Sequence, residues 1–411
     1  MEAVDGGRGV TRLAPLLSTT LDQRAVEIAR AAAAMMLEGD ACGGSAEGAA
    51  TRAWEQRFAS WLNGGQVRAF GSGRAALFAV AKALGLGPGD GVIVPAFTCQ
   101  SVINALRYTG AEPQYADIET DAFGLDVDAV NAATGPRTRA VLLQHTFGLI
   151  GRDIEALLTL AQERQLLVIE DCAHALGATW KGRKLGRLGD GAIFSFERGK
   201  VLSTVHGGMA VVHSPEAAAR LHAWADETPL PDQEQLGSQL SSVVHDYWTL
   251  VADDREKADW AHRQFASTLI PRMWPEEFDG RYCSHYRERM ADVVATLAQS
   301  QFDRLDEVLS RRRAQAAAWQ IWADASGART AKVIAGSQPA WLRFPIWVDA
   351  QTKAEPAALE RELGVELGLW FTSPAHPVPS PQAHCPRGMD ACARVLNLPT
   401  LLPAGHPYGA G

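Results

Sequence analysis

The chain has 411 residues, of which 47% are hydrophobic and 21% are charged, a composition typical of a soluble globular protein. This length predicts two domains, or one large and one small domain. The formal net charge of −8 argues against a nucleic-acid-binding protein, because no basic excess is available to contact phosphates.

The six cysteines are scattered and form no C-x-x-C pair, so neither a zinc ribbon nor a thioredoxin-like motif is indicated. Isolated thiols in a long chain are typical of a reducing compartment. The first residues show no basic stretch followed by an apolar run, and the alanine-rich run at 29–39 is too short to span a bilayer. We therefore expect a cytoplasmic protein without a signal peptide or a membrane segment.

In chain order, residues 21–38 predict an amphipathic helix, 39–50 a glycine-rich loop and 51–62 a second helix. From 66 to about 215, short apolar runs alternate with helical patterns of about ten residues. This alternation predicts an α/β fold whose mainly parallel sheet is covered by helices on both faces.

The remainder of the chain is less regular. Residues 216–285 show few clear elements, whereas 288–326 predict a long helical stretch. Residues 332–411 mix strands, one helix and many prolines. We therefore predict an N-terminal arm and large domain over 1–314 and a small C-terminal α/β domain over 315–411.

Three polar residues lie in or just after predicted strands, at the edge where open α/β sheets bind ligands. Asp171 ends "LLVIED", Ser195 lies within "GAIFSFE", and Lys200 follows beside glycines. Only seven of the 39 basic residues are lysines, and lysine, unlike arginine, can lose its proton and attack a carbonyl. Each residue alone also has a plain interpretation, as a surface lysine, a capping or salt-bridged aspartate, and a small core serine.

Together these residues match the needs of a site for pyridoxal 5'-phosphate (PLP). PLP needs a lysine for a Schiff base and a buried aspartate that keeps its pyridine nitrogen protonated. Its phosphate needs a helix N-terminus and hydroxyl groups. The run "FGSGRAALFAV" offers the backbone N–H groups of Gly73, Arg74 and Ala75, and Ser72 and Ser195 add hydroxyls.

The same glycines allow a rival interpretation. Residues 71–76 fit G-x-G-x-x-A, the dinucleotide fingerprint, after a strand and before a helix. The next acidic residue, Asp90, lies in the turn "LGPGDG", whereas a ribose-binding acid belongs at the end of the following strand, which ends in Phe97. We therefore rank a nicotinamide-dependent oxidoreductase below the interpretation in which this helix start binds the phosphate of PLP.

Three segments resemble the DegT/DnrJ/EryC1/StrS aminotransferases, namely "SGRAALFAVAKALGLGPGDGVIVPAFT", "VIEDCAHALGATWKGRKLGRLGDGAIFSFERGK" and "RMADVVATLAQSQFDRLDEVLSRRR". Their order and spacing match from about residue 25 to 403, and the ending "SPAHP" and "ARVLNLPT" is also similar. The resemblance implies a fold-type I, PLP-dependent enzyme. It also implies that Lys200 forms the internal aldimine, that Asp171 pairs with the pyridinium nitrogen, and that Ser195 and the 73–75 backbone bind the phosphate.

The resemblance also draws attention to three histidines. His174 stands where the family has Gln or His near the cofactor's phenolic oxygen. His376, in "SPAHP", stands where the family often has a histidine on the substrate side. The run "KVLSTVHGG" replaces the family's acidic, glycine-rich run after the lysine and places His206 near the site.

Three further positions depart from the family pattern. Arg74 stands where the family usually has Thr. Cys99 stands where an aromatic side chain usually stacks on the pyridine ring, so that stacking is either lost or taken over by Phe97. Arg287 replaces an Asn that in the family reaches the partner subunit's phosphate.

The function implied by the resemblance is transfer of an amino group to a keto sugar, a ketocyclitol or a related natural-product intermediate. The donor would be glutamate or glutamine, and the protein would be a homodimer with the site at its interface and Arg287 reaching across. One alternative is a PLP-dependent lyase, dehydratase or bond-forming enzyme, motivated by the deviations around the ring. Another is a PLP-binding regulator, although the chain shows neither a lost lysine nor an appended DNA-binding segment.

Overall fold

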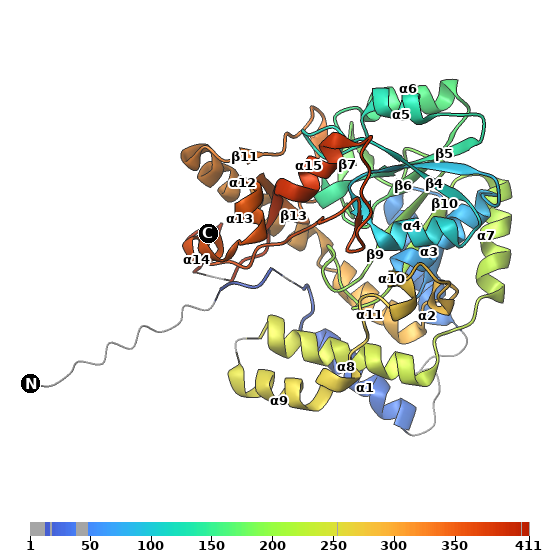
Figure 1. Cartoon of the computed structure of the whole chain (residues 1–411). Coiled ribbons are helices and arrows are strands. Elements are labelled where there is room, and N and C mark those ends of the chain that lie inside the picture. Colours follow the sequence, from blue (N-terminus) through green and yellow to red (C-terminus); the bar gives the residue numbers. More distant parts are fainter. Residues whose placement is uncertain (1–12, 17–18, 38–47, 253, 404, 411) are drawn as a thin grey trace, which may run out of the picture.

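Figure 1 shows a computed structural model of the chain, which describes residues 13–16, 19–37, 48–252, 254–403 and 405–410. The predicted glycine-rich loop at 39–50 lies mostly outside the described residues. The helices predicted on either side of it are present as α1 (Gln23–Leu37) and α2 (Ala49–Leu62).

A seven-stranded sheet with the order β1-β10-β9-β6-β5-β2-β4 forms the centre of the molecule. Its strands are β1 (Gln66–Phe70), β2 (Gly91–Pro95), β4 (Glu112–Ala116), β5 (Thr138–Gln144), β6 (Leu167–Asp171), β9 (Gly191–Ser195) and β10 (Gly208–Val212). Strands β4, β2, β5, β6 and β9 pair in parallel, and β10 runs antiparallel to both β9 and β1. This confirms the predicted α/β fold with a mainly parallel sheet.

Helices cover both faces of this sheet because the strands are apolar on both sides. Val92 and Val94 belong to one buried cluster, together with residues of α3 (Gly73–Ala83), α4 (Gln100–Arg107) and α7 (Pro215–Glu227). Ile93, between them, belongs to the cluster on the other face, since successive strand side chains point to opposite faces. That cluster includes residues of α1, α2, α5 (Val127–Ala133), α6 (Ile154–Glu163) and α11 (Asp292–Phe302).

A second, smaller sheet lies in the C-terminal part. Its strands are β11 (Arg329–Thr330), β13 (Arg343–Trp347) and β15 (Val395–Pro399), and nearby helices are α12 (Leu305–Ser326), α13 (Ala350–Ala354), α14 (Ala357–Leu363) and α15 (Pro386–Arg394). The N-terminal part of α12 packs through Leu305 and Val308 into the core beside the large sheet, whereas Trp319 packs against the small one. The predicted boundary between 314 and 315 falls inside this helix and stays a prediction.

Short strand pairs join the two parts. Strand β14 (Ala375–His376) pairs in parallel with β3 (Thr98–Cys99), which follows β2 directly. Strand β12 (Ser337–Gln338) pairs with β7 (Thr179–Trp180), and β7 also pairs with β8 (Arg183–Lys184). The first of these pairings brings C-terminal residues to the edge of the sheet where β2 ends.

Residues 216–285 are more helical than the sequence pattern indicated. They hold most of α7 together with α8 (Gln233–Leu250), α9 (Arg255–Phe265) and α10 (Pro275–Phe278), and short 3₁₀ helices cover Ala266–Thr268 and Ser284–Tyr286, as one does Thr146–Gly148. Asp232 and Asp254 cap α8 and α9 by accepting a hydrogen bond from the backbone N–H three residues on, which is a helix-start signal readable in the sequence. The predicted stretch 288–326 is divided between α11 and α12.

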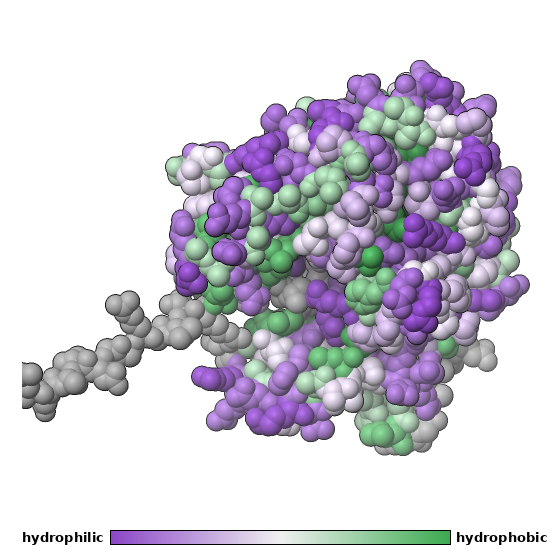
Figure 2. Space-filling model, viewed as in Figure 1, coloured by the Kyte–Doolittle hydropathy of each residue, from purple (hydrophilic) through white to green (hydrophobic). Residues whose placement is uncertain are grey.

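Figure 2 shows hydrophilic residues over much of one face of the molecule, including the outer side of α9 at the lower edge. Helix α9 packs on α8, which in turn packs on α1, as the elements at the bottom of Figure 1 show. Among the described residues, no helix has the length and apolar character needed to cross a bilayer.

Candidate active site

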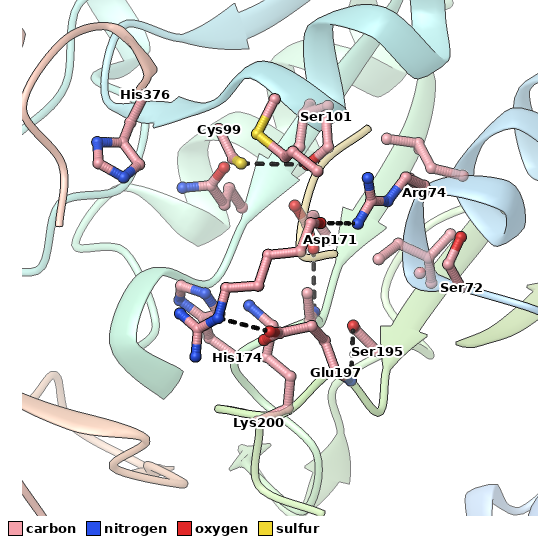
Figure 3. Close-up of a pocket in the computed structure, with 18 of the residues that line it drawn as sticks. Ser72, Arg74, Cys99, Ser101, Asp171, His174, Ser195, Glu197, Lys200 and His376 are labelled. Atoms are coloured by element: carbon pink, nitrogen blue, oxygen red, sulfur yellow. Dashed lines mark hydrogen bonds and ion pairs between the residues drawn. The ribbon is translucent and has the colours of Figure 1, made fainter. Parts of the chain in front are cut away.

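A cavity of about 480 Å³ opens at the carboxyl ends of β6 and β9 (Figure 3). Its walls come from three parts of the chain, namely the strand ends with the start of α3, the stretch 272–278, and the C-terminal stretch 370–377. All of the predicted site residues line this cavity except Ala75 and Arg287. The fold therefore brings together residues that lie up to about three hundred positions apart in the chain.

Lys200 lies in the loop that follows β9, and its backbone N–H donates to the carbonyl of Glu197. Its Nζ is 4.9 Å from the centroid of the Trp370 ring. Burial lowers the pKa of Lys200 below its usual 10.5, although Glu197, Cys99 and Asp171 oppose that shift. A partly buried lysine with a lowered pKa is a better nucleophile than an exposed one, because a larger fraction of its amine is unprotonated.

Asp171 is the last residue of β6, and its side chain faces the same cavity (Figure 3). The backbone N–H of Ala173 donates to its Oδ1 at 2.9 Å. Burial raises the pKa of Asp171, while Ala173, Lys200 and His145 act in the opposite direction. A buried carboxylate whose charge is only partly compensated would be stabilised by a protonated ring nitrogen placed against it.

The N-terminus of α3 forms another wall of the cavity. Ser72 caps this helix, because its Oγ accepts a hydrogen bond from the Ala75 N–H at 3.2 Å. A Cβ on Gly73 would lie 2.7 Å from the Cβ of Ser195, and a Cβ on Gly208 would lie 2.4 Å from the Ser72 carbonyl oxygen. The close approach of β9 and β10 to the helix start therefore requires glycine at both positions, and it places the Ser195 hydroxyl beside the helix N-terminus.

His174 and Trp370 form a stacked pair in the wall beside Lys200. Their ring centroids are 5.2 Å apart with an interplanar angle of 10°. Burial, followed by the charges of Lys200 and Arg343, lowers the pKa of His174 well below 6.5. Its Nδ1 accepts the Phe147 N–H at 3.1 Å, so the neutral ring carries its proton on Nε2.

His376 and Cys99 face each other across the β3–β14 pair. The His376 Nδ1 accepts the backbone N–H of Thr372 at 3.3 Å and lies 2.9 Å from its Oγ1, so the neutral ring has its proton on Nε2. Burial, followed by the charge of Lys353, lowers the pKa of His376 to about 4. The Ser101 hydroxyl donates to the Cys99 Sγ at 3.1 Å.

The model of the DegT/DnrJ/EryC1/StrS aminotransferase family matches residues 27–403. The chain belongs to this family. It is an aminotransferase, as the sequence analysis predicted, and the family consists of PLP-dependent enzymes.

Two curated relatives of this family member align over most of its length. The chain is 31% identical over 366 residues to the spore coat polysaccharide biosynthesis protein SpsC of Bacillus subtilis, covering 86% of this chain and 85% of that protein. It is 30% identical over 360 residues to the dTDP-4-dehydro-2,3,6-trideoxy-D-glucose 4-aminotransferase of Saccharopolyspora spinosa, covering 86% and 84%.

Solved structures of aminotransferases have the same fold. The aminotransferase TlmJ from Streptoalloteichus hindustanus superposes with a TM-score of 0.68 at 25% identity, covering 94% of this chain and 92% of that one. DesV of S. venezuelae, solved in complex with a ketimine intermediate, gives a TM-score of 0.67 at 25% identity, covering 96% and 95%.

Within this DegT-family aminotransferase, the side chain of Arg74 turns away from the helix N-terminus. Its guanidinium forms a buried ion pair with Glu277 and donates to the carbonyl of Arg272. Burial opposes the charged form, yet Glu277 outweighs it and raises the pKa of Arg74 above its usual value. Arg74 can therefore serve the phosphate through its backbone N–H, while its side chain has another partner.

Trp370 is an aromatic residue of the cavity wall, together with Phe278 and Phe371. Phe97, one possible substitute for the missing stacking residue, is fully buried and packs edge-on against Phe371 at 5.0 Å. It does not line the cavity, whereas Trp370 does. The pattern gave no sign of this, because Trp370 belongs to the C-terminal part, five residues before the strand β14 that pairs with β3.

Arg287 lies outside the cavity of this single chain. Its guanidinium carbon is 4.8 Å from the centroid of the Trp224 ring. Its predicted role toward a partner subunit's phosphate stays a prediction.

Two charged residues of the cavity wall were missed in the sequence. Glu197 lies two positions after Ser195, and a residue at that spacing continues on the same face of an extended strand, so alternation could have found it. Arg272 comes from the irregular stretch before α10, where no periodicity indicates which side chains point inward. The rival dinucleotide acid, Asp90, accepts the Gly87 N–H in the turn before β2, at the opposite end of that strand.

Proposed function

We propose that this aminotransferase binds PLP in the cavity and transfers an amino group to a keto sugar, a ketocyclitol or a related natural-product intermediate. The observation that carries this proposal is that Lys200, Asp171 and the N-terminus of α3 line the same cavity. Relatives named as aminotransferases of dTDP- and UDP-linked keto sugars support the substrate class.

The residues of the cavity fit PLP. Its volume of about 480 Å³ lies within the usual range for small-molecule sites. The helix start with Ser72, Gly73 and Ser195 suits a phosphate. The partly compensated carboxylate of Asp171 suits a protonated ring nitrogen, and Lys200 supplies the amine for the aldehyde.

Bound there, PLP supplies an electron sink for the bond-breaking steps. Lys200 would hold the cofactor through its amine and, once free of it, would serve as the base and acid that moves the substrate's Cα proton. Asp171 would hold the ring nitrogen in its protonated form, because a cation against this carboxylate favours the ionised state of both groups. The Nε2–H of neutral His174 is available to donate to the ring's oxygen, and the side chain of Trp370 helps to exclude water.

We further propose that glutamate or glutamine is the donor and that the protein is a homodimer with the site at its interface. Cys99, Cys172, Cys283, Cys385 and Cys392 are free thiols, which supports a reducing, cytoplasmic location.

Single-turnover absorbance spectra test the proposed reaction. The purified protein should be yellow, and glutamate or glutamine should convert the aldehyde form of the cofactor to the amine form, which a ketone acceptor then reverses. A yellow protein that no common donor converts would instead favour a lyase, dehydratase or bond-forming enzyme. A colourless protein that binds NAD tightly would instead support a nicotinamide-dependent oxidoreductase.

The rate at which the apo-protein takes up PLP should rise with pH. Only the unprotonated amine of Lys200 attacks the aldehyde, and burial lowers the pKa of this lysine below 10.5. The rate should therefore reach its plateau at a lower pH than the rate of a free lysine side chain. Stopped-flow absorbance over a pH series measures this, and a midpoint at or above 10.5 would contradict the assigned environment.

A further inference from the structure

The stretch 270–278, here called the wall segment, closes one side of the cavity. It leads into α10 and contributes Arg272, Met273 and Phe278 to the lining. It belongs to the part of the chain, between α9 and α11, in which the sequence pattern indicated few elements. Side-chain contacts, and not the elements of the segment itself, therefore show how it is attached to the site.

Two side chains from the cofactor side of the cavity hold the wall segment. Arg74 pairs with Glu277 and donates to the Arg272 carbonyl, and the ring Nε2 of His206 donates to the Pro271 carbonyl at 3.1 Å. Burial, followed by the charge of Arg74, lowers the pKa of His206 to about 3, so His206 is a neutral donor. Arg74 and His206, which both depart from the family pattern, thus both hold the wall segment against the cavity.

The carboxylate of Glu277 is fully engaged in this attachment. Its side chain is completely buried, and it also accepts the Tyr286 hydroxyl and the Trp274 N–H, both at 2.7 Å. A buried ion pair that is also hydrogen-bonded on both oxygens fixes the segment in one place. The backbone of Arg272 is therefore held, while its side chain is left to point into the cavity.

In contrast, the ion pair that the Arg272 side chain makes is loose. Its Nε is 3.6 Å from Oε1 of Glu197, which is beyond hydrogen-bond distance, and that buried oxygen has no hydrogen-bond partner among the described residues. The Arg272 side chain is 43% exposed and that of Glu197 is 17% exposed. Although burial opposes ionisation, Arg272 and Lys200 lower the pKa of Glu197, so the carboxylate is charged.

We propose that Arg272 recognises the acidic group of the substrate and exchanges Glu197 for it on binding. This inference rests on the proposed function, which supplies two sources of such a group, the carboxylate of the amino donor and the diphosphate of a nucleotide-linked acceptor. A guanidinium matches either in bidentate fashion. Glu197 holds the arginine in position between turnovers, and its weak contact makes the exchange inexpensive.

Titration calorimetry of the PLP-loaded protein tests the proposal without requiring turnover. The probes are glutarate, a dicarboxylate without an amino group that could react with the cofactor, for the carboxylate and inorganic pyrophosphate for the diphosphate. The wild type should bind one of them, and Arg272→Gln should bind that probe about 10- to 100-fold more weakly, as expected for loss of a charge-assisted contact. Arg272→Lys should restore part of the affinity, and Glu197→Gln, which frees the arginine, should increase it.

Arg281→Gln is the matched control, because Arg281 is exposed and pairs with Asp279 near the wall segment at 3.1 Å. It should leave both affinities unchanged. In steady-state assays the KM of the corresponding substrate should rise in Arg272→Gln by the same factor, with kcat changed less than about threefold.

The probe whose affinity falls in Arg272→Gln shows whether the acidic group is the donor's carboxylate or the acceptor's diphosphate. Equal affinities of wild type and Arg272→Gln for both probes would overturn the proposal, as would a variant whose PLP affinity falls while probe binding is unaffected. A protein without transaminase activity would refute the proposed reaction, yet the calorimetric comparison would still decide the role of Arg272.

Discussion

Replacement of Lys200 with alanine is expected to lower turnover by more than about 10⁴-fold. Proton transfer by a positioned side chain contributes roughly 10²–10⁴-fold, and in the proposed function Lys200 would also supply the covalent attachment of the cofactor. The variant should still fold and retain some PLP, because the helix start and Asp171 are untouched. Steady-state kinetics and the absorbance of the purified variant measure both effects.

The matched control is Lys181→Ala. Lys181 is exposed, pairs with Glu155 at 2.8 Å and lies 4.6 Å from the Trp180 ring, so its loss should change turnover little. Both variants remove a lysine side chain, and only one of them removes it from the cavity.

Borohydride reduction followed by peptide mapping supplies a direct check on the attachment point. The label should be found on Lys200. The strongest competitor is Lys353, whose pKa burial lowers to about 8 and whose Nζ donates to the Phe371 carbonyl beside the cavity. A label on Lys353 would overturn the assignment of Lys200.

The sequence predicted the central sheet because its strands are apolar on both faces and alternate with helices. The ends of β6 and β9, adjacent and parallel, then had to meet at one edge, and this explains why Asp171 and Ser195 could be assigned to one site before the fold was known. The need for glycine at 73 and 208 could not be predicted, because it comes from close packing. A Cβ at these positions would lie 2.7 Å from the Ser195 Cβ and 2.4 Å from the Ser72 carbonyl oxygen, respectively.

The site residues that escaped prediction come from elsewhere in the chain. Trp370 lies just before β14, which pairs with β3 across more than 250 residues of the chain, and a pattern confined to neighbouring positions cannot reveal such a contact. Arg272 depends on an irregular stretch that is held by side chains rather than by its own periodicity. For the same reason the departure at Arg74 looked unexplained in the sequence, since its partner Glu277 lies in that stretch.

Asp171→Asn is expected to lower turnover by about 10³-fold. The amide keeps the size of the side chain but loses the negative charge, so the ring nitrogen is no longer held protonated and the ring no longer withdraws electrons effectively. Lys200 remains available, and the variant should therefore still be yellow. Single-turnover rates with the donor measure the loss, and the surface variant Asp303→Asn, which removes an aspartate paired with Arg57 at 2.9 Å, is the control.

A loss of less than about tenfold would mean that another acid faces the ring. The neighbouring Glu170 is a poor candidate, because its carboxylate already accepts the backbone N–H groups of Gly186, Leu188 and Gly189 and pairs with His145 at 3.2 Å. Although it is fully buried, these partners lower its pKa, whereas burial raises that of Asp171. Of the two adjacent carboxylates, only Asp171 lines the cavity. A protonated ring nitrogen should therefore be stabilised by Asp171 and not by Glu170.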